Sequence, residues 1–203
     1  MVESYLLFDL QKIPELLDCV LLNQTCDNDE LVRSILCRLE RVDTFFMLDK
    51  KEMTCCFTGH RILPKGKEKQ IFDRTREIVI DLIEKGVRYF GTGGAIGYDA
   101  LAAHAVLSLK EKYPFIKLIV VCPCKNQDAK WNESQKRIYR DILNNADKVV
   151  VLADTYYDGC MQVRNRHLID NSKYCVCYIT RNFGGTYNAV QYAQERNKDI
   201  IYL

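Results

Sequence analysis

The sequence predicts an α/β domain built on a doubly wound, mostly parallel sheet flanked by helices. From residue 53 onward, short apolar runs alternate with amphipathic stretches of helical length. Glycine-bearing loops follow several of the apolar runs. Nearly continuous apolar strands are typical of a parallel sheet covered on both faces, and right-handed crossovers between them give a Rossmann-like arrangement.

The expected elements follow one another in strict alternation. Strands are expected at 54–58, 87–91, 116–122, 148–153, 174–180 and 199–203. Helices are expected at 68–85, 98–112, 131–146, 160–172 and 185–197. Lys85-Gly86 and Asn197-Lys198 are suitable stops for the first and last of these helices.

Residues 1–50 are predicted to form a separate helical extension that precedes the domain over 53–203. Pro14 suits the first turn of one helix, and Asp27 with Glu30 suits the start of another. An apolar stripe at helical spacing follows, formed by Leu31, Ile35, Leu39, Val42 and Phe46. This stripe requires a partner surface, on the main domain or on a second subunit, so we expect a homo-oligomer.

Composition excludes several classes of protein. The 203 residues are 48% hydrophobic and 28% charged, which is an ordinary globular composition. A net charge of +2 gives no chain-wide attraction to nucleic acid or to an anionic membrane. The amino terminus has no basic region of a secretory signal, and no uncharged apolar stretch approaches the ~18 residues of a membrane span. We therefore expect a cytoplasmic protein without membrane contact.

The ten cysteines are expected to pack as small hydrophobic residues. Several lie on or at the ends of expected strands, and the sequence has no CxxC pair. Structural zinc usually requires closely paired ligands, so no metal site is expected.

In such a sheet, ligands bind beyond the carboxyl ends of the strands. Thr58, Gly59, His60 and Arg61 follow the first strand. Glycine allows backbone amides to approach a ligand, and arginine offers a planar fork of donors to phosphate or carboxylate. The alternative is a tight turn with two solvated polar side chains.

The second strand leads into GTGGAIGYDA, in which Gly93, Gly94 and Gly97 precede a helix start. Such a loop can present amide hydrogens to an anion. It is not the dinucleotide fingerprint, because Ile96 stands where the third glycine is required. The alternative is close packing of helix on strand. Asp99 either caps the helix or holds a ligand hydroxyl.

Two residues suited to contact a nucleobase follow the third strand, and two arginines follow the fourth. Gln127 can read a base edge, and Trp131 can stack on a ring or anchor the core. Arg164 and Arg166 lie two apart on a helix, so at most one is expected to point into the cleft. The alternative for this segment is that both arginines are solvated on the surface.

Gly184, Gly185 and Thr186 open the last helix. Backbone amides, the positive end of the helix dipole and a hydroxyl meet there, which is a small phosphate seat. The alternative is a helix-start turn without a ligand.

Taken in order, TGHR, GGAIGYD, NQDAKW, CMQVRNR and GGTYNAVQYA resemble the YpsA-like group of the SLOG superfamily over about residues 53–203. That superfamily includes DprA and the LOG phosphoribohydrolases. The resemblance implies a pocket for a nucleotide or nucleotide-derived ligand. It makes the glycines of both loops, with Thr186, the phosphate shell, and TGHR the opposite wall.

The resemblance also implies that one catalytic residue of the LOG hydrolases is missing from this chain. LOG hydrolases carry PGGxGTxxE, whereas Ala189 occupies the glutamate position in this chain. Arg164 matches the arginine of the LOG helix. Removal of a catalytic carboxylate commonly lowers the rate by ~10²–10⁴.

Three functions follow from the sequence. The favoured one is a binding module that senses or sequesters a nucleotide-type ligand and requires no cofactor. The second is an N-glycosidic-bond hydrolase that acts on a nucleoside phosphate, with Arg164, Asp99 and His60 as candidate catalytic residues. The third is binding of single-stranded nucleic acid in the manner of DprA, against which the low net charge argues.

Overall fold

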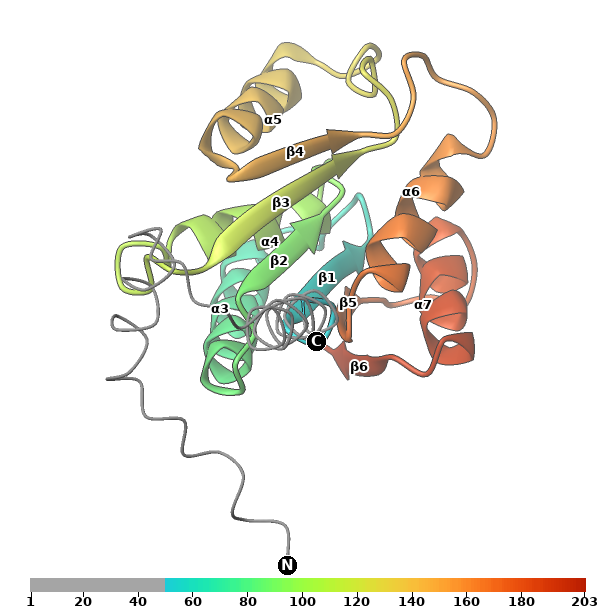
Figure 1. Cartoon of the computed structure of the whole chain (residues 1–203). Helices are drawn as coiled ribbons and strands as arrows, with labels where there is room; N and C mark the ends of the chain where they lie inside the picture. The colour runs from blue at the N-terminus through green and yellow to red at the C-terminus, as the bar shows by residue number, and fades with distance from the viewer. Residues whose placement is uncertain (1–49) are drawn as a thin grey trace, which may run out of the picture. The chain divides into compact units, whose positions relative to one another are not determined.

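A computed structural model describes residues 50–203 (Figure 1). The predicted helical extension lies, apart from its last residue, outside the described residues. The described part forms a six-stranded parallel sheet in the order β4-β3-β2-β1-β5-β6. The strands are β1 (Thr54–Gly59), β2 (Tyr89–Thr92), β3 (Lys117–Cys122), β4 (Lys148–Val151), β5 (Tyr174–Tyr178) and β6 (Asp199–Tyr202). The predicted fold class is confirmed.

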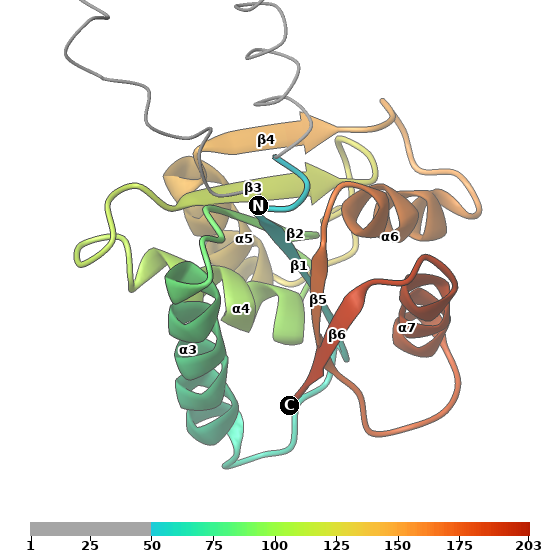
Figure 2. The same cartoon turned by 60° about the horizontal axis from the view of Figure 1, so that its bottom comes forward.

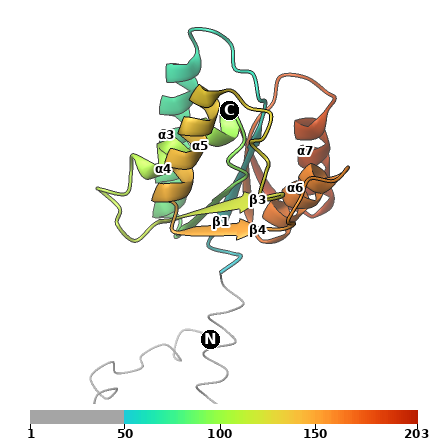
Figure 3. The same ribbon diagram turned by 90° about the horizontal axis from the view of Figure 1, so that it is seen from above.

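Helices form one layer on each face of the sheet, as the view from above shows (Figure 3). One layer consists of α3 (Glu68–Glu84), α4 (Tyr98–Leu107) and α5 (Glu133–Asn145). The other consists of α6 (Cys160–Asp170) and α7 (Gly185–Glu195), which lie side by side (Figure 2). The chain changes layer after β4, so the strand order reverses between β1 and β5. In a doubly wound sheet this switch point is the expected ligand crevice.

The alternation of side chains along β1 divides the core in two. Cys55 and Phe57 are buried toward the layer of α3, α4 and α5. Cys56 is buried toward α6 and α7, where it belongs to a smaller cluster with Leu168 and Ala189. Successive residues of a strand point to opposite faces, so a central parallel strand needs apolar residues at every position.

The helix ends agree with the sequence signals. The last turn of α3 is followed by Gly86 at φ +95°, and α7 is followed by Asn197 at φ +51°. Both residues adopt the left-handed conformation that commonly ends a helix. Asn132 and Gln135 form a reciprocal capping box at the start of α5.

Five of the six predicted strands are shorter in the structure, β2 and β4 among them. β2 begins at Tyr89 rather than at residue 87, because the Val87 amide still donates to the Leu82 carbonyl at the end of α3. β4 ends at Val151 rather than at residue 153. It is an edge strand, and Val149 and Val151 are 42% and 44% exposed, so the predicted cover on both faces does not extend fully to this edge.

The seven cysteines within residues 50–203 are free and buried, consistent with core packing. In the same range, no three His, Cys, Asp or Glu side chains are grouped so as to hold a metal ion. None of the described helices has the length and apolar character needed to cross a membrane. The predicted dimer and cytoplasmic location stay predictions.

Candidate functional site

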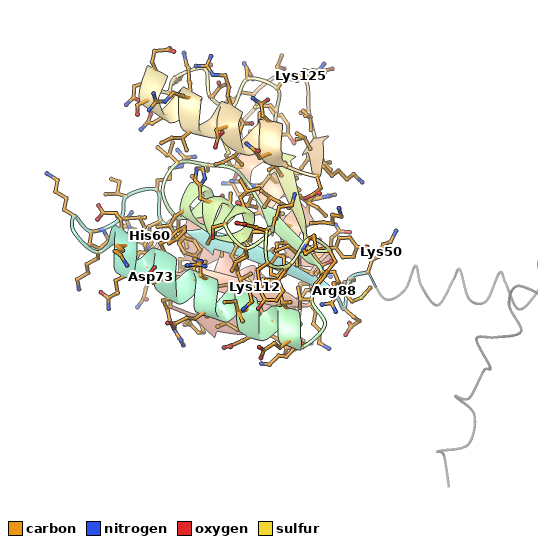
Figure 4. The ribbon with its side chains drawn as sticks, turned by 90° about the vertical axis from the view of Figure 1, so that its left-hand side faces the viewer. Lys50, His60, Asp73, Arg88, Lys112 and Lys125 are labelled. Carbon is orange, nitrogen blue, oxygen red and sulfur yellow. The ribbon has the colours of Figure 1, made fainter. Side chains whose placement is uncertain are left out.

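The loops after β1 and β5 are tied together at the switch point. The Thr180 amide donates to His60 Nε2 at 2.9 Å, and the Thr186 hydroxyl donates to the Gly59 carbonyl at 2.9 Å. Figure 4 shows His60 at the opposite end of the sheet from Lys50 and Arg88. The two bonds therefore fix the start of α7 against the carboxyl end of β1.

His60 is buried and held in its neutral form. Its side chain is only 5% exposed. Burial, together with the positive charge of Arg181, lowers the pKa of His60 below its ordinary value. Because Nε2 accepts the Thr180 amide, that nitrogen is not free to take a proton from a ligand. In this geometry His60 positions the loop after β5.

A buried ion pair joins the two helical layers behind this edge. Arg164 of α6 donates from Nη1 to Asp99 Oδ2 of α4 at 3.4 Å, and both side chains are buried. Burial raises the pKa of Asp99, and the Arg164 charge opposes that rise. Arg164 also donates from Nε to Asn165 Oδ1 at 2.9 Å. Arg166 is exposed, so the two arginines lie in different surroundings.

Glycines of the loop between β2 and α4 allow close protein packing. A Cβ on Gly93 would lie 1.1 Å from Arg164 Nη1, so the guanidinium occupies the space of the missing side chain. Gly97 has φ +85°, and its Cβ would lie 2.4 Å from the Arg61 carbonyl oxygen. Gly59, after β1, is similarly covered by the Tyr98 side chain at 2.5 Å.

Gly184 and Gly185 differ, because their side-chain positions are open. Within residues 50–203, a Cβ built on either glycine has no heavy atom within 4 Å beyond its chain neighbours and the backbone of its own helix. Gly184 has φ +90°, and α7 begins at Gly185. The Cβ positions of both glycines are therefore open, and the first amides of α7 have no intrahelical partner.

Two cavities lie at this edge, one in each helical layer. The first, of ≈ 180 Å³, lies between α4 and α5 and is lined by Arg61, Gly94, Ile96, Gly97, Ala100, Trp131, Gln135, Ile138 and Tyr139. The second, of ≈ 280 Å³, is a groove between α6 and α7 lined by Gln162, Asn165, Arg166, Ile169, Gly185, Asn188, Ala189, Gln191, Tyr192 and Glu195. Of the sequence-predicted residues, Arg61, Gly94, Gly97 and Trp131 line the first cavity, Gly185 lines the second, and the others line neither.

Trp131 lines the first cavity, and Gln127 holds the glycine loop beside it. Trp131 is partly buried, and its ring meets that of Tyr139 edge-on at 5.2 Å between centroids. Gln127 is buried and donates from Nε2 to the Gly93 carbonyl at 3.2 Å. Its Oε1 is buried without a hydrogen-bond partner in the described part of the chain. Gln127 therefore holds the glycine loop. Thr58 is buried within β1.

Four groove-lining residues that carry carboxamides were not predicted from the sequence. Gln162 and Asn165 lie three apart on α6, and Asn188 and Gln191 lie three apart on α7. Residues at this spacing share a helix face. The signal was therefore present as two pairs of carboxamides, but nothing in the sequence indicates that the two faces meet.

The sequence model of the YpsA family, described as the YspA SLOG family, matches residues 65–202. The chain belongs to the YpsA family of SLOG proteins. It is 34% identical over 136 residues to the SPβ prophage-derived protein YoqJ of Bacillus subtilis strain 168, and the match covers 61% of this chain and 80% of YoqJ.

UPF0398 proteins match over a shorter length. One from Halalkalibacterium halodurans is 36% identical over 96 residues, which covers 46% of this chain and 51% of that protein. YpsA of Bacillus subtilis strain 168 is 30% identical over 96 residues, covering 46% of this chain and 53% of YpsA. The chain thus spans about half the length of these UPF0398 relatives.

Two solved structures of DNA processing protein A share the fold. The Helicobacter pylori protein, whose structure concerns its single-stranded DNA binding mode, has a TM-score of 0.54 at 21% identity, covering 76% of this chain and 66% of that chain. The Streptococcus pneumoniae protein has a TM-score of 0.56 at 18% identity, covering 76% and 52%. At these identities the likeness extends to the fold alone.

Proposed function

We propose that the SLOG domain binds a nucleotide or nucleotide-derived ligand whose phosphate contacts Gly184, Gly185 and Thr186. The observation that carries the proposal is the open space at the side-chain positions of Gly184 and Gly185, at the start of α7. This start lies at the switch point between β1 and β5, where doubly wound sheets bind their ligands.

The electrostatics of this position favour an anion. The unpaired amides and the helix dipole together present a partial positive charge at the start of α7. Arg181 is exposed on the same loop and adds a full positive charge. Membership of the SLOG family is in keeping with a nucleotide or nucleic-acid ligand.

Binding is proposed rather than hydrolysis because the acids and bases near the seat are engaged or absent. Asp99 is paired with Arg164, and His60 Nε2 accepts the Thr180 amide. Ala189 carries no carboxylate. Among the groove-lining residues, the carboxylate of Glu195 lies ten residues beyond Gly185, about 15 Å along the helix.

Single-stranded nucleic acid is a second candidate ligand, favoured by exposed rings at the same edge. Tyr156, Tyr157 and Phe183 are 55%, 46% and 65% exposed, and the Arg181 guanidinium lies 5.3 Å from the centroid of the Phe183 ring. Aromatic rings with nearby cations are the usual platform for unpaired bases. Binding of an oligonucleotide with a steep dependence on salt would support this candidate, and a flat dependence would exclude it.

The proposal is tested by isothermal titration calorimetry of the full chain with nucleoside monophosphates, diphosphates and ribose 5-phosphate. We expect at least one of these phosphates to bind saturably. Gly184→Ala should weaken that binding about tenfold or more, because a methyl group would enter the phosphate seat. Gly66→Ala is the matched control, since Gly66 is also open and has φ +79°. Equal affinities for the two variants would overturn the proposed seat.

The same incubations distinguish binding from hydrolysis. After titration, the mixtures are separated by liquid chromatography and free base is measured. We expect no base beyond that of a protein-free sample. Base release that is abolished by Arg164→Ala in a folded protein would show that the chain is a hydrolase.

A further inference from the structure

We infer that the groove between α6 and α7 is a subsite that recognises the hydrogen-bonding edge of a nucleobase. The inference rests on the proposed function, because the groove is located by its continuity with the phosphate seat. Gly185 belongs to both the seat and the groove wall. The cavity between α4 and α5 includes none of Gly184, Gly185 or Thr186 among its lining residues.

The size of the groove suits the remainder of a mononucleotide. Its volume of ≈ 280 Å³ lies near the lower end of small-ligand sites, which begin at about 300 Å³. Ile169 and Ala189 are buried and provide an apolar floor. The walls, in contrast, are polar.

Four carboxamides line the groove, two from α6 and two from α7. Their side chains are those of Gln162, Asn165, Asn188 and Gln191. A carboxamide carries an acceptor oxygen and two donor hydrogens side by side. Nucleobase edges carry the same pattern of neighbouring donors and acceptors, and Asn and Gln are common partners of such edges.

One of these carboxamides is already oriented by the buried ion pair. Asn165 Oδ1 accepts from Arg164 Nε at 2.9 Å, so the amide hydrogens of Asn165 remain available as donors. Arg164 is in turn fixed by Asp99 and by the space above Gly93. The groove therefore holds a pre-oriented donor, which favours a base with an acceptor at that position.

The contacts of Tyr192 favour recognition of a base by its hydrogen-bonding edge rather than by stacking. The guanidinium groups of Arg166 and Arg196 lie 5.3 and 5.0 Å from its ring centroid. The Tyr192 hydroxyl donates to the Asp170 carboxylate at 3.0 Å. The aromatic ring that lines the groove is therefore engaged with protein cations.

The inference is tested by comparing AMP, GMP, CMP and UMP with ribose 5-phosphate in calorimetric titrations. We expect the preferred mononucleotide to bind about tenfold or more tightly than ribose 5-phosphate. Asn188→Ala and Gln162→Ala should each reduce this ratio several-fold and leave the affinity for ribose 5-phosphate unchanged. Both side chains are exposed, so the variants should fold.

Gln135→Ala is the matched control, because Gln135 is a carboxamide that lines the other cavity. In this variant, the ratio of the affinity for the preferred mononucleotide to that for ribose 5-phosphate should equal the wild-type ratio. If this affinity ratio falls in Gln135→Ala and not in Asn188→Ala, the base binds in the cavity beside Trp131, and the inference is overturned. A wild-type protein that binds ribose 5-phosphate and the mononucleotides equally would also overturn it, while the phosphate seat would stand. Absence of binding to every phosphate would contradict the proposed function itself.

Discussion

The two glycine-rich loops at the carboxyl edge of the sheet use the same residue for opposite purposes. In the loop between β2 and α4, the absent side chains of Gly93 and Gly97 make room for Arg164 and for the backbone after β1. At the start of α7, the absent side chains of Gly184 and Gly185 leave open space. The first loop is part of the core, whereas the second leaves open space in which we propose that a ligand binds.

This difference teaches that a glycine pattern alone does not identify a phosphate site. Both loops lie after a strand and before a helix, and both have the sequence of an anion-binding turn. What separates them is the occupant of the space above each glycine. For Gly93 that occupant is a guanidinium of the same chain.

The largest expected effect comes from filling the packed loop. Gly93→Ala would place a methyl group 1.1 Å from the present position of Arg164 Nη1, so the arginine must leave its buried partner. Breaking a buried ion pair on one side typically costs about 3–5 kcal/mol. We expect a loss of this size in the free energy of unfolding, measured with urea. A loss below ~1 kcal/mol would show that the loop is not part of the core.

The next largest effect is expected from breaking the ion pair between Asp99 and Arg164. Asp99→Ala alone should destabilise by about 3 kcal/mol, because it leaves the Arg164 charge buried without its partner. Asp99→Ala combined with Arg164→Met should cost clearly less than the sum of the two single changes. The double-mutant cycle in urea measures this coupling, and strict additivity would contradict a coupled pair.

A smaller effect is expected at the link between the loops. Thr186→Val removes the hydroxyl that donates to the Gly59 carbonyl, at a cost of about 1–2 kcal/mol, whereas Thr186→Ser keeps the donor. Thermal unfolding of both variants measures the difference. If the serine variant is as unstable as the valine variant, the hydrogen bond is not what stabilises the start of α7.

The smallest effect concerns pH. The pKa of His60 is lowered in the folded protein, so its contribution to stability is fully present above the unfolded value of 6.5 and is lost as the pH falls through the lower folded value. His60→Gln retains an acceptor for the Thr180 amide and should lose less stability on acidification than the wild type. The melting temperature, followed from pH 7.5 to about 5, measures this. An unchanged slope in His60→Gln would contradict the assignment.

Sequence periodicity was sufficient for the fold. Apolar strands, amphipathic helices and glycine stops are local signals, and they located every strand and helix within residues 50–203 to within a few positions. The edge exposure of Val149 and Val151 was missed, because strand order is set by tertiary pairing.

The candidate site was predicted only in part, because its geometry depends on distant contacts. The loops were correctly located at the carboxyl edge. However, Arg164 and Asp99 lie 65 residues apart in the sequence, and no local pattern indicates that they pair. The same holds for Asn165 and Asn188, which line one groove only because α6 and α7 pack side by side.

The most direct test of the contrast between the two loops is Gly185→Ala, measured for both stability and ligand binding. Gly185 has an ordinary φ and open space at its Cβ position, so we predict a free energy of unfolding within about 0.5 kcal/mol of the wild type. The affinity for the best-bound phosphate should fall about tenfold or more. A Gly185→Ala variant destabilised as strongly as Gly93→Ala would contradict the contrast between a packed first loop and an open second loop. A variant that binds phosphates as tightly as the wild type would contradict ligand binding at the second loop.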